Sequence, residues 1–212
     1  VNIFEESYRE YKQSEKQKNL SEIYWKKLEI TDNQTITTNK WLFNYQYAGI
    51  IAKAIPNAKI IHCYRNPLDN ILSTYRAHFA TGNNFSSSLV DSAEVYSDQD
   101  EIMRTYKKEF KNHIYSLNYD KLVTHPSDEI KSLIHWLGWS WNDLYLSPHL
   151  NKRKVSTRSN VQVRSPINTK SLGGWKNYKE MLKPAMEIIT KKEEYKDLKS
   201  VSYTHLTLPT IG

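Results

Sequence analysis

An arginine that ends a predicted strand, with a serine eight residues later, is the part of this chain best suited to bind a phosphate group. Residues 59–64 form a short apolar run, typical of a buried parallel strand, and Arg65 follows it. Asn66 and Pro67 predict a helix start, and Ser73 falls two turns into that helix. A planar fork of donors beside a hydroxyl makes a good phosphate clamp. A solvated arginine and serine are the alternative.

A lysine is expected at the same edge of the sheet. Residues 35–38 have the composition of a strand, Lys40 follows them, and residues 43–54 carry apolar side chains at helical spacing. The order of strand, helix and strand predicts a βαβ unit with a crossover helix. Ligands of open α/β sheets bind at the carboxyl ends of the strands, so Lys40 and Arg65 would serve one site. A solvated loop lysine is the alternative.

Two later segments complete the predicted order of elements. A strand is expected through Leu117 and Tyr119, followed by a helix that begins near Pro126 and ends at Gly138. Tyr119 can also be a core aromatic residue. Further on, a glycine-containing turn precedes Trp175 and a last helix, and small residues with free backbone amides can hold an anion. A mobile basic loop is the alternative there.

These segments resemble the sulfotransferases that use 3′-phosphoadenosine-5′-phosphosulfate (PAPS), and most closely the tyrosylprotein and TPR-type sulfotransferases. The resemblance spans residues 39–178 and keeps the order of the family's motifs. It rests on Asn39-Lys40, the strand with Arg65 and Ser73, Tyr119-Asp120-Lys121-Leu122, and Ser159 with Gln162-Val163-Arg164-Ser165-Pro166 and Gly173-Gly174-Trp175.

The resemblance implies catalytic roles for two residues and a nucleotide clamp made by three others. Lys40 would contact the leaving phosphate, and Ser159 would support the leaving group. Arg65 and Ser73 would hold the 3′-phosphate of PAPS, with Arg76 one turn further along the helix. The reaction would need no metal, because these cations neutralise the charge of the phosphates.

The remaining nucleotide contacts implied by the resemblance lie later in the chain. Tyr119 would lie near the nucleotide, and the segment with Gly173 and Gly174 would wrap its phosphates with the help of Arg164. Tyrosylprotein enzymes carry a lysine directly before the tryptophan of this turn. Gly174 stands there in this chain, so Lys176 is the nearer candidate.

The fold implied is α/β, a mostly parallel sheet flanked by helices, similar to that of P-loop nucleotide kinases. The family opens with a Gly-x-Pro-Arg-Ser-Gly-Thr type of loop, and the tyrosylprotein branch has a glutamate base soon after it. Neither is recognisable here, and the chain starts with a charged helical stretch, residues 4–28. We therefore expect residues 1–200 to be a partial sulfotransferase domain, truncated at its N-terminus. The early glutamates are expected to be solvated helix charges: Glu5, Glu6, Glu10, Glu15, Glu22 and Glu29.

Residues 201–212 are expected to be a non-native tail. Residues 201–210 contain no Asp, Glu, Lys or Arg, and they can be back-translated as GTC TCT TAT ACA CAT CTG ACG CTG CCG ACG. That sequence looks like the transposase adapter used in building shotgun sequencing libraries. The tail is therefore excluded from reasoning about the fold. A genuine β-prone tail is the alternative.

Composition indicates a soluble, basic chain. Its 212 residues suit one domain, and 39% of them are hydrophobic. No apolar run approaches the ~20 residues of a membrane helix. The net charge of +7 suits an anionic nucleotide. We expect a cytoplasmic location, although a truncated start leaves a signal or anchor open. Cys63 is the only cysteine, and we expect it to be buried in its strand.

The sequence thus predicts an enzyme that moves a sulfuryl group from PAPS to an acceptor hydroxyl or amine, with this fragment inactive as it stands. The acceptor can be a peptide tyrosine, a glycan or a small molecule, and a homodimer is left open. One alternative is an inactive nucleotide-binding relative. Another is a basic nucleic-acid-binding module, in which Trp136, Trp139 and Trp141 would stack on bases. Packing around the end of their helix is the simpler role for these tryptophans.

Overall fold

The computed structural model describes residues 2–14, 19–29, 36–77, 79, 82–151 and 162–198. The chain divides into two compact units: unit 1 holds residues 1–62 and 102–115, and unit 2 holds residues 63–101 and 116–212. Ser159, Thr35 and the expected tail at 201–212 lie outside the described residues.

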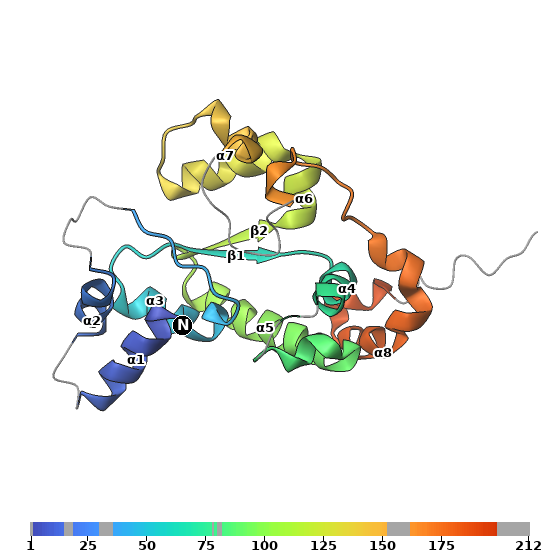
Figure 1. Cartoon of the computed structure of the whole chain (residues 1–212), viewed down its shortest axis with the longest axis horizontal. Helices are drawn as coiled ribbons and strands as arrows, with labels where there is room; N and C mark the ends of the chain where they lie inside the picture. Colours follow the sequence, from blue (N-terminus) through green and yellow to red (C-terminus); the bar gives the residue numbers. More distant parts are fainter. Residues whose placement is uncertain are drawn as a thin grey trace, which may run out of the picture. The chain divides into compact units, whose positions relative to one another are not determined.

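The sheet of the described residues consists of two parallel strands, β1 (Ile60–Tyr64) and β2 (Ile114–Asn118). They lie side by side and point the same way (Figure 1). The backbone N–H of Ile60 donates to the carbonyl oxygen of His113 at 2.8 Å, just before β2 begins. Parallel strands need a long crossover connection, and helices supply it here. The α/β class expected from the sequence is confirmed.

The strand expected at residues 35–38 is not formed by its described residues. Residues 36–40 have no regular secondary structure, and Ile36 is 69% exposed. Threonine and isoleucine favour strands only where their side chains pack on a pleated, half-buried surface. Ile36 has no such cover, so this prediction was wrong.

Strand β1 is buried on one face instead of both. His62 is buried, whereas its neighbours Ile61 and Cys63 are exposed. Successive side chains of a strand point to opposite faces of the sheet. The prediction that Cys63 is buried was therefore wrong, because its face of β1 lies open to solvent.

Unit 1 is built from short helices around two small apolar cores. Its helices are α1 (Ile3–Gln13), α2 (Leu20–Lys27), η1 (Asn44–Tyr47) and α3 (Ala48–Ala54). The helix expected over residues 43–54 is thus confirmed as η1 and α3. Helices α1 and α2 pack against each other (Figure 1). The cores are centred on Phe4, Leu20, Tyr24 and Ile55, and on Ala48, Met103 and Ile114.

Unit 2 contains most of the remaining elements. They are α4 (Pro67–Ala77), η2 (Asn84–Ser87), α6 (Tyr119–Thr124), α7 (Pro126–Leu137), η3 (Asp143–Leu146), η4 (Pro148–Leu150), η6 (Gln162–Arg164), η7 (Gly174–Tyr178), α8 (Lys179–Ile189) and η8 (Glu193–Tyr195). The long helix α5 (Leu89–Glu109) begins in unit 2 and ends in unit 1.

Local signals placed the ends of these helices well. Asn66 caps α4, since its side-chain oxygen accepts from the N–H groups of Leu68 and Asp69. Helix α7 ends at Gly138 in the left-handed conformation, as expected. Tyr119 was expected to close a strand, but it is the first residue of α6. The reason is its neighbour Asn118, whose side chain caps α6 by accepting from Lys121.

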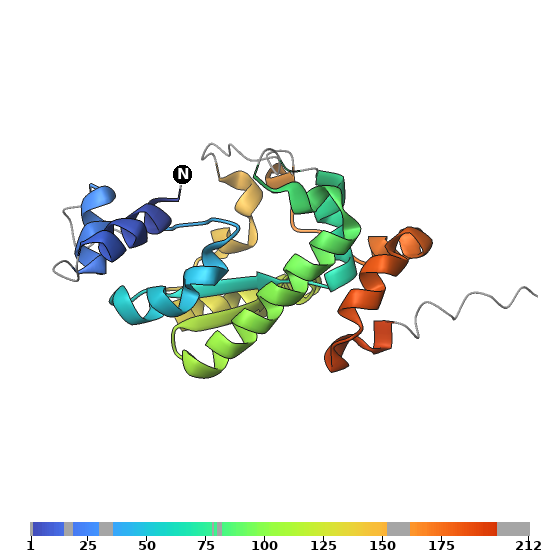
Figure 2. The same ribbon diagram turned by 90° about the horizontal axis from the view of Figure 1, so that it is seen from below.

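One apolar core holds α4 against the C-terminal part of unit 2. Leu68, Ile71 and Leu182 are completely buried in it, together with Trp175 at 2% exposure. Helices α4 and α8 are neighbours in this core (Figure 2). The core therefore places the start of α4 beside the segment that precedes α8. Within the described residues, no helix is both long enough and apolar enough to cross a membrane.

The burial of His62 in β1 can be tested separately, because burial, together with the nearby charge of Lys107, lowers its pKa from 6.5 to about 4. The unfolded chain then takes up a proton at a higher pH than the folded protein. Stability is fully present above pH 6.5 and is lost as the pH falls towards 4. The loss attributable to His62 is at most about 3 kcal/mol.

His62→Gln should remove that part of the acid sensitivity. Urea unfolding at pH 7 and pH 4.5 measures the difference in the free energy of unfolding for each protein. His135→Gln, at an exposed position of α7, is the control and should behave as the wild type does. An equal acid loss in H62Q and the wild type would show that His62 does not carry it.

Candidate functional site

Arg65 directly follows β1, and its side chain contacts two acceptors and an aromatic ring of unit 2. Its Nη2 donates to the backbone carbonyl of Ser171 at 2.6 Å and lies 3.7 Å from Oδ2 of Asp69. The guanidinium carbon lies 5.2 Å from the centre of the Tyr119 ring, within the range of a cation–π contact. The predicted phosphate-binding arginine is therefore held in a defined place at the carboxyl ends of both strands.

The Nε donor of this guanidinium differs from Nη2. Among the residues that the structure describes, Nε of Arg65 is buried and has no hydrogen-bond partner. A buried donor without an acceptor costs about 1–3 kcal/mol, and native proteins contain few of them. Arginine binds phosphate and carboxylate through a pair of adjacent N–H groups. The unpartnered Nε is thus consistent with a site made for an anion.

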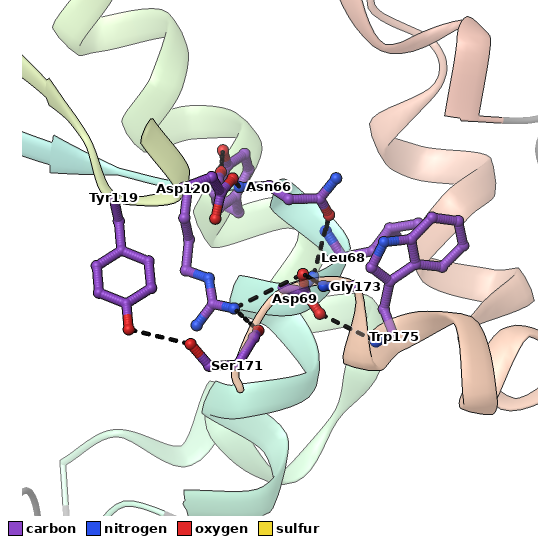
Figure 3. A network of polar contacts seen from close by, with 10 residues as sticks. Asn66, Leu68, Asp69, Tyr119, Asp120, Ser171, Gly173 and Trp175 are labelled. Carbon is purple, nitrogen blue, oxygen red and sulfur yellow. Dashed lines mark hydrogen bonds and ion pairs between the residues drawn. The ribbon is translucent and has the colours of Figure 1, made fainter. Parts of the chain in front are cut away.

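Asp69, on the first turn of α4, ties a second segment to this arginine. Its Oδ2 accepts from the N–H of Gly173 at 2.7 Å, and its Oδ1 accepts from the N–H of Trp175 at 2.9 Å (Figure 3). The carboxylate is only 4% exposed. Tyr119 is joined to the same segment, since its hydroxyl lies 3.0 Å from Oγ of Ser171 (Figure 3). We call these residues the Arg65 network: Arg65, Asp69, Tyr119, Ser171, Gly173 and Trp175.

A second carboxylate holds the turn between β1 and α4. Oδ2 of Asp120 accepts from the N–H of Asn66 at 2.7 Å. The hydroxyl of Tyr96 donates to the carbonyl of Arg65 at 3.0 Å. Burial raises the pKa of Tyr96, with smaller effects from Tyr195 and nearby carboxylates, so the hydroxyl stays protonated and remains a donor. The backbone on both sides of Arg65 is therefore fixed.

The other two predicted clamp residues lie along α4. Asp69, Ser73 and Arg76 are spaced by four and three residues, which places them on one side of the helix. Ser73 and Arg76 are exposed. The guanidinium of Arg76 lies 5.8 Å from the centre of the Tyr178 ring of η7. Ser73 and Arg76 therefore follow Asp69 along this side of α4, one and two turns beyond the Arg65 network.

The remaining candidates differ in how they relate to this network. Gly173 belongs to it through a backbone N–H, and Gly174 is adjacent, since a Cβ at that position would lie 3.7 Å from Oδ1 of Asp69. Lys176 is exposed in η7. Arg164 is exposed in η6 and donates to the backbone carbonyl of Asn151.

The structure leaves the roles of the two predicted catalytic residues as predictions. Lys40 is exposed in unit 1, at the end of the irregular segment 36–40. Ser159 lies outside the described residues. Among the side chains that the structure describes, no group of three or more His, Cys, Asp or Glu is placed to hold a metal ion.

Sequence reasoning missed three residues that organise the site. Asp69 carried a usable signal, because an acidic residue four positions after Arg65 can pair with it at the start of a helix. Asp120 belonged to a motif of the resemblance, Tyr119-Asp120-Lys121-Leu122, but only its tyrosine was given a role. Ser171 offered no signal, since its contact with Arg65 joins residues 106 positions apart.

Comparisons with known proteins give the fold and the class of this protein. The structure of the Sulfotransferase Domain from the Curacin Biosynthetic Pathway matches with a TM-score of 0.50 over 93% of this chain and 77% of that chain, at 14% sequence identity. That likeness gives the chain a sulfotransferase fold. A family model described as "Sulfotransferase family" matches residues 3–143, so the chain belongs to the sulfotransferase family.

Two relatives extend this result. An uncharacterized protein of Aquifex aeolicus (strain VF5) is 35% identical over 158 residues, which are 73% of this chain and 20% of the relative. Protein-tyrosine sulfotransferase 1 of Danio rerio is 27% identical over 145 residues, which are 65% of this chain and 41% of the relative. The chain therefore spans less than half the length of these relatives.

The contact between Asp120 and Asn66 gives a stability prediction. Asp120→Ala should lower the free energy of unfolding by about 1–3 kcal/mol, because the N–H of Asn66 loses its acceptor in a partly buried turn. Asp98→Ala, at an exposed position of α5, should change it by less than about 0.5 kcal/mol. Urea unfolding measures both. Equal effects would mean that the carboxylate of Asp120 does not stabilise the turn.

Proposed function

We propose that the complete protein transfers a sulfuryl group from PAPS to an acceptor hydroxyl or amine. The observation that carries this proposal is Arg65, fixed at the carboxyl end of β1 with a buried Nε that lacks an acceptor, in a chain of the sulfotransferase family. Since the chain spans less than half the length of its curated relatives, the activity is assigned to the whole protein.

Arg65 is proposed to bind the 3′-phosphate, which distinguishes PAPS from other adenine nucleotides. Its unpartnered Nε would gain a charged acceptor. Ser73 and Arg76 follow along the same side of α4 and would add a hydroxyl and a second guanidinium. Tyr119 covers the Arg65 guanidinium and would limit the access of water to the bound phosphate.

The segment around η7 is proposed to enclose the nucleotide phosphates. The N–H of Gly173 is already engaged with Asp69, so this residue would shape the turn and not donate to the ligand. Gly174 lies beside Asp69, where a Cβ would make only an ordinary contact, and Lys176 is exposed and available to an anion. Arg164 would join them only if η6 approaches the bound nucleotide.

The proposed reaction forms one bond to sulfur and breaks another. The acceptor oxygen or nitrogen attacks the sulfur in line, and the bond between sulfur and the 5′-phosphate oxygen breaks. The products are the sulfated acceptor, 3′,5′-diphosphoadenosine and the proton that the acceptor releases. Lys40 and Ser159 are proposed to stabilise the charge on the departing oxygen. Positioning and electrostatics would supply most of the rate enhancement.

The relative named Protein-tyrosine sulfotransferase 1 makes a peptide tyrosine the first acceptor to test. A net charge of +7 also favours acceptors that carry acidic groups nearby, whether they are peptides or glycans. The tyrosylprotein branch, the partial domain over residues 1–200, the cytoplasmic location and the homodimer stay predictions of the sequence.

Arg65→Ala should weaken the binding of 3′,5′-diphosphoadenosine more than tenfold, because a hydrogen bond to a charged group contributes about 1.5–3 kcal/mol. Calorimetric titration of the protein with this nucleotide and with AMP measures the effect and its dependence on the 3′-phosphate. Arg9→Ala, which removes an exposed arginine of α1, is the matched control and should bind within twofold of the wild type.

The outcomes separate the possible functions. A preference for 3′,5′-diphosphoadenosine, with transfer of label from PAPS by the complete protein, would support the enzyme. The same preference without transfer to any acceptor would indicate a nucleotide-binding relative. Binding of nucleic acid with a steep dependence on salt, and no preference for a 3′-phosphate, would indicate a nucleic-acid-binding module. An unchanged affinity in R65A would remove Arg65 from the site.

A further inference from the structure

Asp69 is the most enclosed charged group of the site, and its contacts converge from separate segments. It is 4% exposed, accepts from two backbone N–H groups of the segment 173–175, and lies 3.7 Å from Nη2 of Arg65. A buried carboxylate is tolerated where donors and a cation compensate it. Among the described residues, the two N–H donors and the cation beside Asp69 come from the loop and from Arg65, and its place on the first turn of α4 adds the favourable helix dipole.

The loop in turn determines where the guanidinium points. The carbonyl of Ser171 accepts from Nη2 of Arg65, and the hydroxyl of Ser171 meets that of Tyr119. The ring of Tyr119 lies against the guanidinium. The contacts therefore form a closed circuit in which Asp69 anchors the loop, the loop holds Tyr119 and Arg65, and Arg65 returns to Asp69. Figure 3 shows the labelled members of this circuit converging on the loop.

Gly173 makes the anchor possible. Its φ of +67° lies in the left-handed region, which allows the chain to turn so that the N–H groups of Gly173 and Trp175, two residues apart, reach a single carboxylate. A residue with a Cβ would have a strained backbone there. Space is not the obstacle, since the nearest atom to such a Cβ is a side-chain atom of Lys176 at 3.8 Å. The glycine is thus required by the backbone and not by crowding.

We propose that Asp69 is a positioning residue for nucleotide binding, which fixes the loop 171–175 and through it the orientation of the Arg65 guanidinium. The proposal rests on the function proposed above for Arg65. Asp69 itself would not touch the ligand, because a buried carboxylate cannot donate to a phosphate and would repel it. The effect of Asp69 on the contact between Arg65 and the 3′-phosphate should therefore disappear when Arg65 is removed.

Asp69→Asn tests this dependence. The amide keeps the size of the side chain, but one of its two acceptors becomes a donor that faces a backbone N–H, so the loop loses an anchor. We expect D69N to bind 3′,5′-diphosphoadenosine at least tenfold more weakly than the wild type. Asp128→Asn, on the first turn of α7 and exposed, is the matched control and should bind within twofold.

A double-mutant cycle separates positioning from a general effect on folding. If Asp69 acts through Arg65, adding D69N to R65A should weaken binding by less than twofold further. Losses that multiply would overturn the proposal, as would a D69N protein with wild-type affinity. A wild type that shows no preference for 3′,5′-diphosphoadenosine over AMP would instead refute the proposed function, and the role of Asp69 with it. If R65A weakens binding and D69N does not, the role of Asp69 alone is refuted.

Gly173→Ala decides the question if D69N does not fold. It leaves the carboxylate and Arg65 in place and strains only the loop. We expect it to weaken the binding of 3′,5′-diphosphoadenosine severalfold. Gly138→Ala is its control, since Gly138 has a φ of +77° and open space around it at the end of α7. Equal affinities of G173A and G138A would contradict the role of the loop.

Discussion

A guanidinium that is drawn into the protein at the end of a strand must find acceptors, and the structure of unit 2 depends on this constraint. Arg65 finds them in a carboxylate one helical turn ahead and in a carbonyl from the C-terminal part of the chain. An aromatic ring from the start of α6 covers it. Elements that are far apart in the sequence are thereby brought to the carboxyl ends of the two strands.

Two acidic residues of this basic chain stabilise its backbone turns. Asp69 and Asp120 each accept from backbone N–H groups at a turn beside Arg65. A carboxylate is a stronger acceptor for such groups than a neutral side chain, and it also offsets the positive charge nearby. The cations that remain for a ligand are the exposed ones and the unpartnered part of Arg65. The buried carboxylates therefore hold the backbone turns beside Arg65 in place, and the exposed basic side chains supply the positive charge of the surface.

The sequence was sufficient where the signal was local. The apolar run of β1, the cap at Asn66, the left-handed Gly138 and the turn before the buried Trp175 were all recognisable from neighbouring residues. The prediction of a strand at 35–38 was wrong because β-prone residues form a strand only where other parts of the fold give their side chains a surface to pack on. The prediction that Cys63 is buried was wrong for a related reason, because elements far away in the sequence determine which face of a strand is covered. The contacts of Asp69 with Gly173 and Trp175 could not be predicted, because these partners lie more than a hundred residues away.

The long separation between Arg65 and Ser171 has a consequence for the order of folding. Ser171 is synthesised 106 residues after Arg65, so β1 and α4 leave the ribosome long before the loop that completes their edge. During that interval, water takes the place of the Ser171 carbonyl at Arg65, and the apolar face of α4 is not yet covered by Trp175 and Leu182. Contacts of such long range form late and slowly. The nascent chain thus carries an incomplete sheet edge while the next 106 residues are added, a state in which chaperone contact is most useful.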